Sequence, residues 1–144
     1  MAWAYFDTSA LVKRYIREPR SLQVRALLRR YDFVSSAITP VEIASALHRR
    51  KHEGDLSEEN FAALLRRIRQ DRLRWELVEV SSVVLDRAEE LLQGATRLRA
   101  LDAIQIASLV VFQSASQMRI SFVTADARQR DAATRLSLDV IWIG

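Results

Sequence analysis

The chain has 144 residues, 49% of them hydrophobic and 28% charged, a balance typical of a single soluble globular domain. Without cysteine it can form neither a disulfide nor a thiolate metal site. No apolar segment is long enough to cross a bilayer, so we expect a cytoplasmic protein without membrane attachment. Residues 1–74 hold 15 Lys and Arg against 9 Asp and Glu, whereas residues 75–144 hold 7 against 9. The basic half predicts a polyanionic partner, although solvated helix faces would give the same excess.

The order of the apolar patterns predicts the fold class. Five short apolar runs predict buried strands, at residues 2–6, 33–34, 77–80, 120–123 and 140–143. Helical periodicity covers residues 9–16, 21–30, 40–51, 61–68, 84–92, 101–112 and 126–134. Strands that alternate with helices indicate an α/β fold, a three-layer α/β/α sandwich around a parallel sheet of about five strands. We expect residues 1–144 to form one domain, with a helical hairpin over residues 40–74.

Four acidic residues lie where apolar runs meet helical segments. Asp7 and Asp126 directly follow predicted strands, Glu42 opens a helical stretch, and Asp102 interrupts an apolar one. In an open parallel sheet, ligands bind outside the carboxyl ends of the strands, where residues from separate elements can converge. Crowded carboxylates repel one another unless a hard cation or a shared proton neutralises them. The sequence therefore predicts a divalent-metal site.

Each of three acids also has a purely structural interpretation. Asp7 and Asp126 could simply cap the helices that follow them. Glu42 fits a capping box, with Thr39 as the cap and Pro40 at the first helical position. Taken one at a time, these capping roles are the commoner ones. The metal site depends on the joint pattern.

Asp102 is harder to explain by local structure alone. Apolar residues surround its predicted helix almost completely, so we expect the helix to be buried. A buried charge without a partner costs several kcal/mol, and a helix dipole returns at most about 1 kcal/mol. A cation would resolve the imbalance, and a hydrogen-bonded structural aspartate is the alternative.

Four motifs in order resemble those of a known family. They are Asp7-Thr8-Ser9-Ala10-Leu11, Thr39-Pro40-Val41-Glu42-Ile43-Ala44, Leu101-Asp102-Ala103-Ile104-Gln105-Ile106-Ala107 and Phe122-Val123-Thr124-Ala125-Asp126. Together they resemble the PIN-domain ribonucleases, and most closely the VapC-type toxins of toxin–antitoxin pairs. The last motif departs from the family pattern, because Arg128-Gln129-Arg130 stands where a bulky apolar residue usually follows.

The resemblance implies an activity and a set of roles. It implies RNA cleavage with Mg²⁺ or Mn²⁺, a homodimer, and inhibition by a cognate antitoxin. It also implies an acidic quartet of Asp7, Glu42, Asp102 and Asp126, supported by Ser9 and Thr124. An excess of apolar residues in the predicted hairpin, residues 40–74, suggests a dimer as well.

The chemistry that suits these residues is metal-assisted phosphodiester hydrolysis. Oxygen ligands suit Mg²⁺, with Asp7 and Asp102 as first choices, Asp126 on the same or a second ion, and Glu42 acting through water. Four basic residues are candidates for drawing in the RNA backbone: Lys13, Arg49, Arg50 and Lys51.

Other function classes fit the sequence less well. A phosphatase with an aspartyl nucleophile usually needs a second Asp where Ser9 stands. A phospho-accepting receiver domain needs paired acids after its first strand, where this chain has Asp7 alone. A catalytically weak or inactive RNA- or partner-binding module remains open as the alternative.

Overall fold

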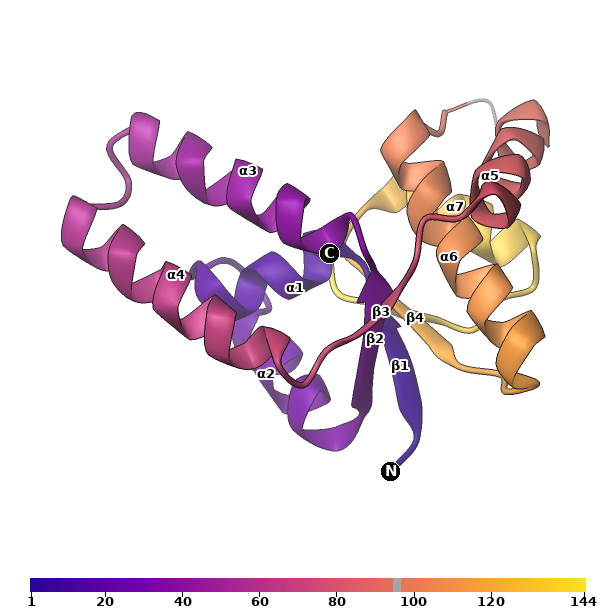
Figure 1. The fold of residues 1–144 in the computed structure, drawn as a ribbon, viewed down its shortest axis with the longest axis horizontal. Helices are drawn as coiled ribbons and strands as arrows, with labels where there is room; N and C mark the ends of the chain where they lie inside the picture. The colour runs from indigo at the N-terminus through magenta and orange to yellow at the C-terminus, as the bar shows by residue number, and fades with distance from the viewer. Residues whose placement is uncertain (95–96) are drawn as a thin grey trace.

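The computed structural model describes residues 1–94 and 97–144 (Figure 1). Its strands are β1 (Trp3–Phe6), β2 (Asp32–Ser36), β3 (Glu76–Val78), β4 (Ser121–Thr124) and β5 (Val140–Trp142). Its helices are α1 (Thr8–Tyr15), α2 (Ser21–Arg30), α3 (Thr39–His52), α4 (Glu58–Arg72), α5 (Ser82–Gly94), α6 (Ala100–Ser116) and α7 (Ala127–Arg135). All five predicted strands and all seven helical segments are confirmed, with bounds that differ by a few residues.

The five strands form one parallel sheet in the order β3-β2-β1-β4-β5. The chain moves outward from β1 through β2 to β3, then returns to the other side of β1 for β4 and β5. Strand order therefore reverses between β1 and β4, and such a reversal leaves a crevice at the carboxyl ends of the two strands. A candidate site is therefore expected at the carboxyl ends of β1 and β4.

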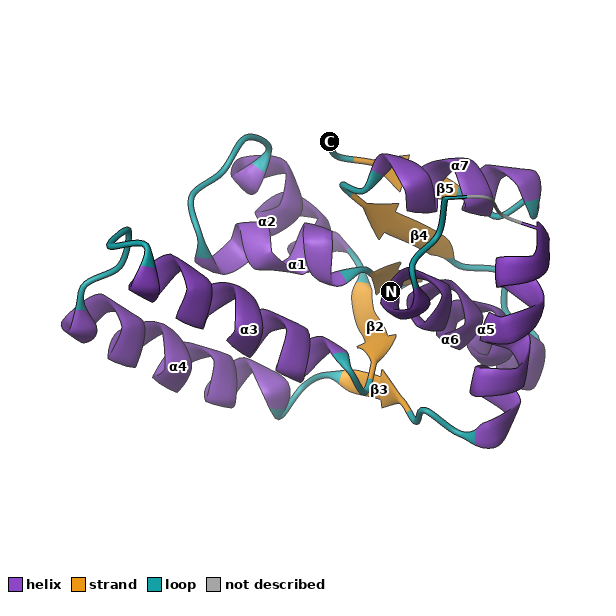
Figure 2. Ribbon diagram, turned by 90° about the horizontal axis from the view of Figure 1, so that it is seen from above, coloured by secondary structure: helices purple, strands orange, loops and turns teal. Residues whose placement is uncertain are grey.

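Helices cover both faces of the sheet, which confirms the three-layer α/β/α sandwich (Figures 1 and 2). Side chains alternate along each strand, so Tyr5 and Phe122 pack with α5, α6 and α7. Phe6 and Val123 point the other way, toward α1 and α2. Because both faces are buried, the central strand β1 is continuously apolar, and β2 and β4 each carry an apolar pair, Phe33-Val34 and Phe122-Val123.

The predicted helical hairpin is confirmed. Helices α3 and α4 run side by side away from the sheet (Figures 1 and 2). Their apolar stripes meet each other and α1 in a separate small core that contains Leu11, Leu47, Phe61 and Ile68. No helix in the described residues is long and apolar enough to span a membrane.

Candidate functional site

The reversal of strand order brings two of the predicted acids to adjacent strands. Asp7 follows β1 directly, and Asp126 follows β4 after one intervening residue. The two strands are hydrogen-bonded neighbours, and the backbone N–H of Asp7 donates to the carbonyl of Val123 at 2.9 Å. The carboxylates of Asp7 and Asp126 are thus carried to the mouth of one crevice by separate elements.

Asp7 caps α1, as predicted, and is also the most buried of the four acids. Its side chain is 4% exposed. Oδ2 accepts from the backbone N–H of Ser9, and Oδ1 accepts from Nε2 of Gln129, both at 2.9 Å. The pKa of Asp7 is raised from 3.8 to about 6, chiefly by burial and to a lesser extent by the charge of Glu42, whereas the hydrogen bonds from Ser9 and Gln129 oppose the rise. Helix capping alone does not require a carboxylate at a position where burial disfavours its charged form.

The capping box predicted around Glu42 is wrong. Helix α3 already includes Thr39, and its N-cap is Ile38 without a side-chain cap. Thr39 is buried, and its hydroxyl contacts Ser35 at 2.7 Å, because this turn faces β2 and the core. Glu42 Oε1 instead accepts from Thr8 Oγ1 and from Gln105 Nε2, each at 2.7 Å. Glu42 is therefore hydrogen-bonded to α1 and α6 and does not cap its own helix.

Asp102 is less buried than its apolar neighbours suggested. It lies in the first turn of α6, where Leu101 is 50% exposed and Asp102 itself is half-buried. Its Oδ2 accepts from the backbone N–H of Arg99 at 3.2 Å, which is the partner that a structural aspartate would have. Partial burial nevertheless raises its pKa, and the charge of Asp126 raises it further. Asp102 and Asp126 therefore lie close enough to repel one another.

Asp126 caps α7, as predicted. Its Oδ1 accepts from the backbone N–H groups of Arg128 and Gln129, at 2.8 and 3.1 Å. The capping bonds use this one oxygen, and the residue is only half-buried. A role as a cap and a role in the crevice are therefore compatible for Asp126.

Two glutamines tie the acids together, and neither was among the predicted site residues. Gln105 lies three positions after Asp102 in α6, and Gln129 lies three positions after Asp126 in α7, so each shares a helix face with its acid. Each glutamine donates to an acid of another element, Gln105 to Glu42 and Gln129 to Asp7. The sequence signal that could have identified both glutamines is the repeated Asp-x-x-Gln spacing. Gln129 also belongs to the Arg128-Gln129-Arg130 segment that departs from the family pattern.

A hydroxyl fixes the orientation of each amide. Tyr5 donates to Oε1 of Gln105 at 2.7 Å, and Thr124 donates to Oε1 of Gln129 at 2.8 Å. With each carbonyl oxygen occupied, the amide N–H groups must face the carboxylates. Both glutamines are 1% exposed, so water does not compete for these bonds.

The predicted supporting residues, Ser9 and Thr124, lie beside the crevice. Their hydroxyls contact each other at 3.3 Å, and Ser9 Oγ also accepts from the backbone N–H of Ala125 at 3.0 Å. Thr124 Oγ1 accepts from the backbone N–H of Asp126 at 3.1 Å. They connect the ends of β1 and β4 and hold the positions of Asp7 and Asp126.

The structure does not leave all the predicted RNA-binding residues available. Lys13 is only 8% exposed. Arg50 pairs with Glu18 and Asp55, at 3.2 and 3.6 Å. Lys51 pairs with Glu58 at 2.7 Å and lies over the Phe61 ring. Burial of Lys13 and the ion pairs of Arg50 and Lys51, which the sequence pattern does not reveal, thus limit three of the four. Among the four, Arg49 alone is exposed without an ion pair in the described chain.

The donor chemistry of the crevice fits a hard divalent cation. The four acids offer only oxygen ligands. Burial raises the pKa values of Asp7 and Asp102, and the charges of Glu42 and Asp126 add to the rise. Within residues 1–94 and 97–144, no group of three or more His, Cys, Asp or Glu side chains is arranged so that it could hold a metal ion. The shared coordination of Asp7, Asp102 and Asp126 therefore remains a prediction.

Comparison with known proteins decides the family. The PIN domain family matches residues 4–135, which include all four motifs. The chain belongs to the PIN-domain family. Its PIN domain is 35% identical over 145 residues to a protein of Mycobacterium tuberculosis (strain ATCC 25618 / H37Rv) named Ribonuclease VapC46, and the match covers 98% of each chain.

Solved structures also show the fold of this PIN domain. A chain from a structure described as a toxin–antitoxin complex from Klebsiella pneumoniae superposes with a TM-score of 0.60, over 88% of each chain. At 20% identity, this likeness concerns the fold alone.

Proposed function

We propose that the chain is a Mg²⁺- or Mn²⁺-dependent endoribonuclease that hydrolyses RNA phosphodiester bonds as the toxin of a toxin–antitoxin pair. The observation that carries the proposal is Asp7, a buried carboxylate at the strand reversal with its pKa raised to about 6 and Glu42 adding to that rise. Buried, mutually repelling acids in a cleft are typical of functional sites. The relative named Ribonuclease VapC46 supports the substrate.

The four acids would have different roles in hydrolysis. Asp7 and Asp102 would hold the ion directly, with Asp126 on the same or a second ion. When bound, the ion would lower the pKa of a coordinated water and stabilise the charge that develops on the phosphate. Glu42, held by Thr8 and Gln105, would orient the attacking water and accept its proton.

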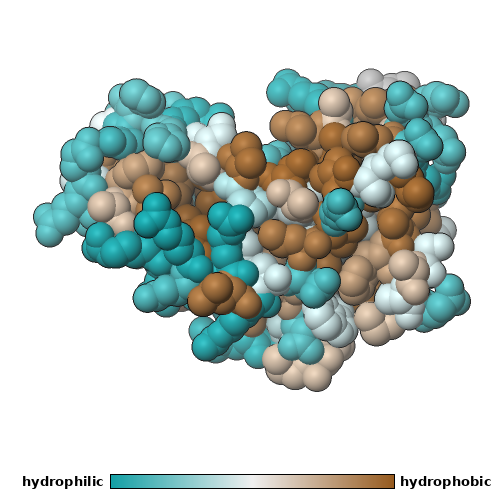
Figure 3. Space-filling view, viewed as in Figure 1, coloured by the Kyte–Doolittle hydropathy of each residue, from teal (hydrophilic) through white to brown (hydrophobic). Residues whose placement is uncertain are grey.

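Two protein partners belong to the proposal. The similarity to Ribonuclease VapC46, together with the resemblance of the four motifs to VapC-type toxins, supports a cognate antitoxin. Exposed apolar side chains support a homodimer, but they do not lie on the hairpin of α3 and α4, where the sequence predicted an excess of apolar residues. They gather over α5 and α6 (Figure 3) and include Val83, Leu85, Leu92 and Leu101, whereas the apolar residues of α3 and α4 are mostly packed. A dimeric mass by light scattering at micromolar concentration would support this face, and a monomeric mass would contradict it.

Incubation of the purified protein with tRNA and rRNA fragments tests the activity directly. We expect cleavage with Mg²⁺ or Mn²⁺, none with EDTA, and none with Asp7→Asn at any metal concentration. Asp86→Asn, a change of an exposed aspartate on α5, is the matched control. RNA binding without cleavage under all metal conditions would favour the non-catalytic alternative.

A further inference from the structure

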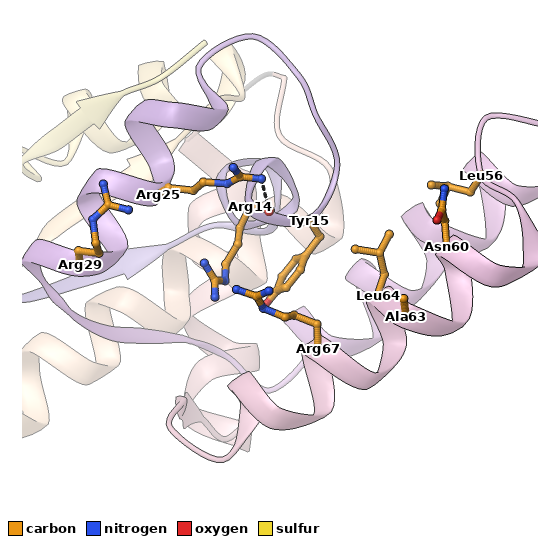
Figure 4. A pocket seen from close by; sticks show the side chains of 9 residues that line it. All are labelled: Arg14, Tyr15, Arg25, Arg29, Leu56, Asn60, Ala63, Leu64 and Arg67. Carbon is orange, nitrogen blue, oxygen red and sulfur yellow. Dashed lines mark hydrogen bonds between the residues drawn. The ribbon is translucent and has the colours of Figure 1, made fainter.

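A groove rich in arginine lies away from the acidic crevice. A pocket of about 600 Å³ separates α4 from α1 and α2, and Arg14, Arg25, Arg29 and Arg67 line it (Figure 4). A second pocket of about 400 Å³ shares the first three arginines and extends to Arg74. We call the two together the arginine groove, defined by these five residues.

The acids of the groove are already satisfied by other groups. Asp71 accepts from Arg14 Nε at 2.9 Å and from the Tyr15 hydroxyl at 2.6 Å. Asp32 faces the N-terminal ammonium at 3.7 Å. In the described residues, no ion pair involves the other four arginines of the groove. Arg25 also donates to the backbone carbonyl of Arg14 at 3.4 Å. With five arginines against Asp32 and Asp71, the groove carries an excess of positive charge.

We propose that the arginine groove binds the phosphate backbone of single-stranded RNA, outside the acidic crevice. Guanidinium groups suit phosphate because their planar donors can engage two oxygens at once. Leu56 and Leu64 also line the pocket and offer a small apolar surface to bases and ribose, whereas Tyr15 is only 8% exposed. In this proposal the arginine groove binds the RNA backbone in place of Lys13, Arg50 and Lys51, which the sequence had suggested.

Helix α1 connects the groove to the crevice. Asp7 caps its first turn, and Arg14 and Tyr15 lie in its last turn. Eight helical residues span about 12 Å, so bound RNA would run within a few nucleotides of the acids. The inference rests on the proposed function for its choice of RNA. An acidic peptide is the rival occupant. RNA is favoured because α1 connects the groove to the acids that are proposed to cleave RNA.

The test measures binding without cleavage. A short fluorescent single-stranded RNA is titrated in EDTA across a series of salt concentrations, with wild-type protein and with Arg29→Gln/Arg67→Gln. We expect the log–log salt slope of the double variant to be shallower by about 1.4, since each phosphate contact on a single strand contributes about 0.7. Arg66→Gln/Arg69→Gln is the matched control, because it removes the same charge from exposed positions of α4 outside the groove.

Each outcome decides the proposal. An equal slope change in the two double variants would overturn it, because nonspecific charge would then explain binding. A labelled oligoglutamate whose binding falls in Arg29→Gln/Arg67→Gln while RNA binding does not would also overturn it, in favour of an acidic peptide. Wild-type protein that binds RNA with the expected slopes but cuts none with Mg²⁺ would reject the proposed activity and leave the groove intact. Circular dichroism melts check that both variants fold.

Discussion

Nε2 of Gln129 donates to Oδ1 of Asp7 at 2.9 Å and joins the first turn of α7 to the cap of α1. The two residues are 122 positions apart in the sequence. Thr124 completes the arrangement by donating to the other end of the same amide. Asp7 is consequently held by a neutral donor that can stabilise its charge without cancelling it.

We expect Gln129→Met to weaken the site without unfolding the protein. Methionine keeps the length and burial of the side chain but removes the donor to Asp7. Loss of a partner that orients a metal ligand typically reduces metal affinity or activity by about 10- to 100-fold. The measurements are Mn²⁺ affinity by calorimetry and RNA cleavage, with exposed Gln70→Met on α4 as the control. Unchanged Mn²⁺ affinity would show that Gln129 has only a packing role.

We expect Asp7→Asn to stabilise the metal-free protein above about pH 6. The folded pKa of about 6 exceeds the ordinary 3.8, so the folded state binds more protons and loses stability as pH rises between these values. At about 1.4 kcal/mol per pKa unit, the penalty removed by asparagine is on the order of 3 kcal/mol. Asparagine still caps α1. Urea unfolding in EDTA at pH 4 and pH 7.5 measures the effect, and an equal difference at both values would contradict it.

Asp102→Asn and Asp126→Asn should lose cleavage and keep the fold. Asparagine can still accept the backbone bonds that Asp102 receives from Arg99 and that Asp126 receives from α7. The negative charge needed for a metal is lost in both variants. Cleavage at saturating Mg²⁺ should fall by at least about 100-fold. A variant that keeps full activity would remove its residue from the site.

Gln105→Leu should destabilise the protein by about 2–3 kcal/mol. The substitution leaves the Tyr5 hydroxyl without its buried acceptor and removes one of the two side-chain partners of Thr39, which keeps Ser35. An unsatisfied buried group costs about 1–3 kcal/mol. Glu42 also loses one of its two donors. Urea unfolding compared with exposed Gln70→Leu measures the cost, and a difference under about 0.5 kcal/mol would mean that the network relaxes around leucine.

Much of the fold follows from local sequence. The strands and helices were predictable because buried parallel strands are continuous apolar runs and helices show a period of 3.6 residues. Asp7 and Asp126 were predictable as crevice residues because they follow β1 and β4, and because α/β connections carry such positions to one sheet edge. The capping roles of both residues depend only on adjacent backbone and were predictable too.

What the tertiary structure alone decided is which side chains meet. Glu42 looked like part of a capping box because Thr39 and Pro40 precede it, yet its partners are Thr8 and Gln105, 34 and 63 positions away. Lys51 looked available for RNA until hairpin packing set it against Glu58 and Phe61. Sequence periodicity fixes which face of a helix is buried, but a hydrogen bond or an ion pair depends on the facing element. Only packing of the layers brings that element within about 3 Å.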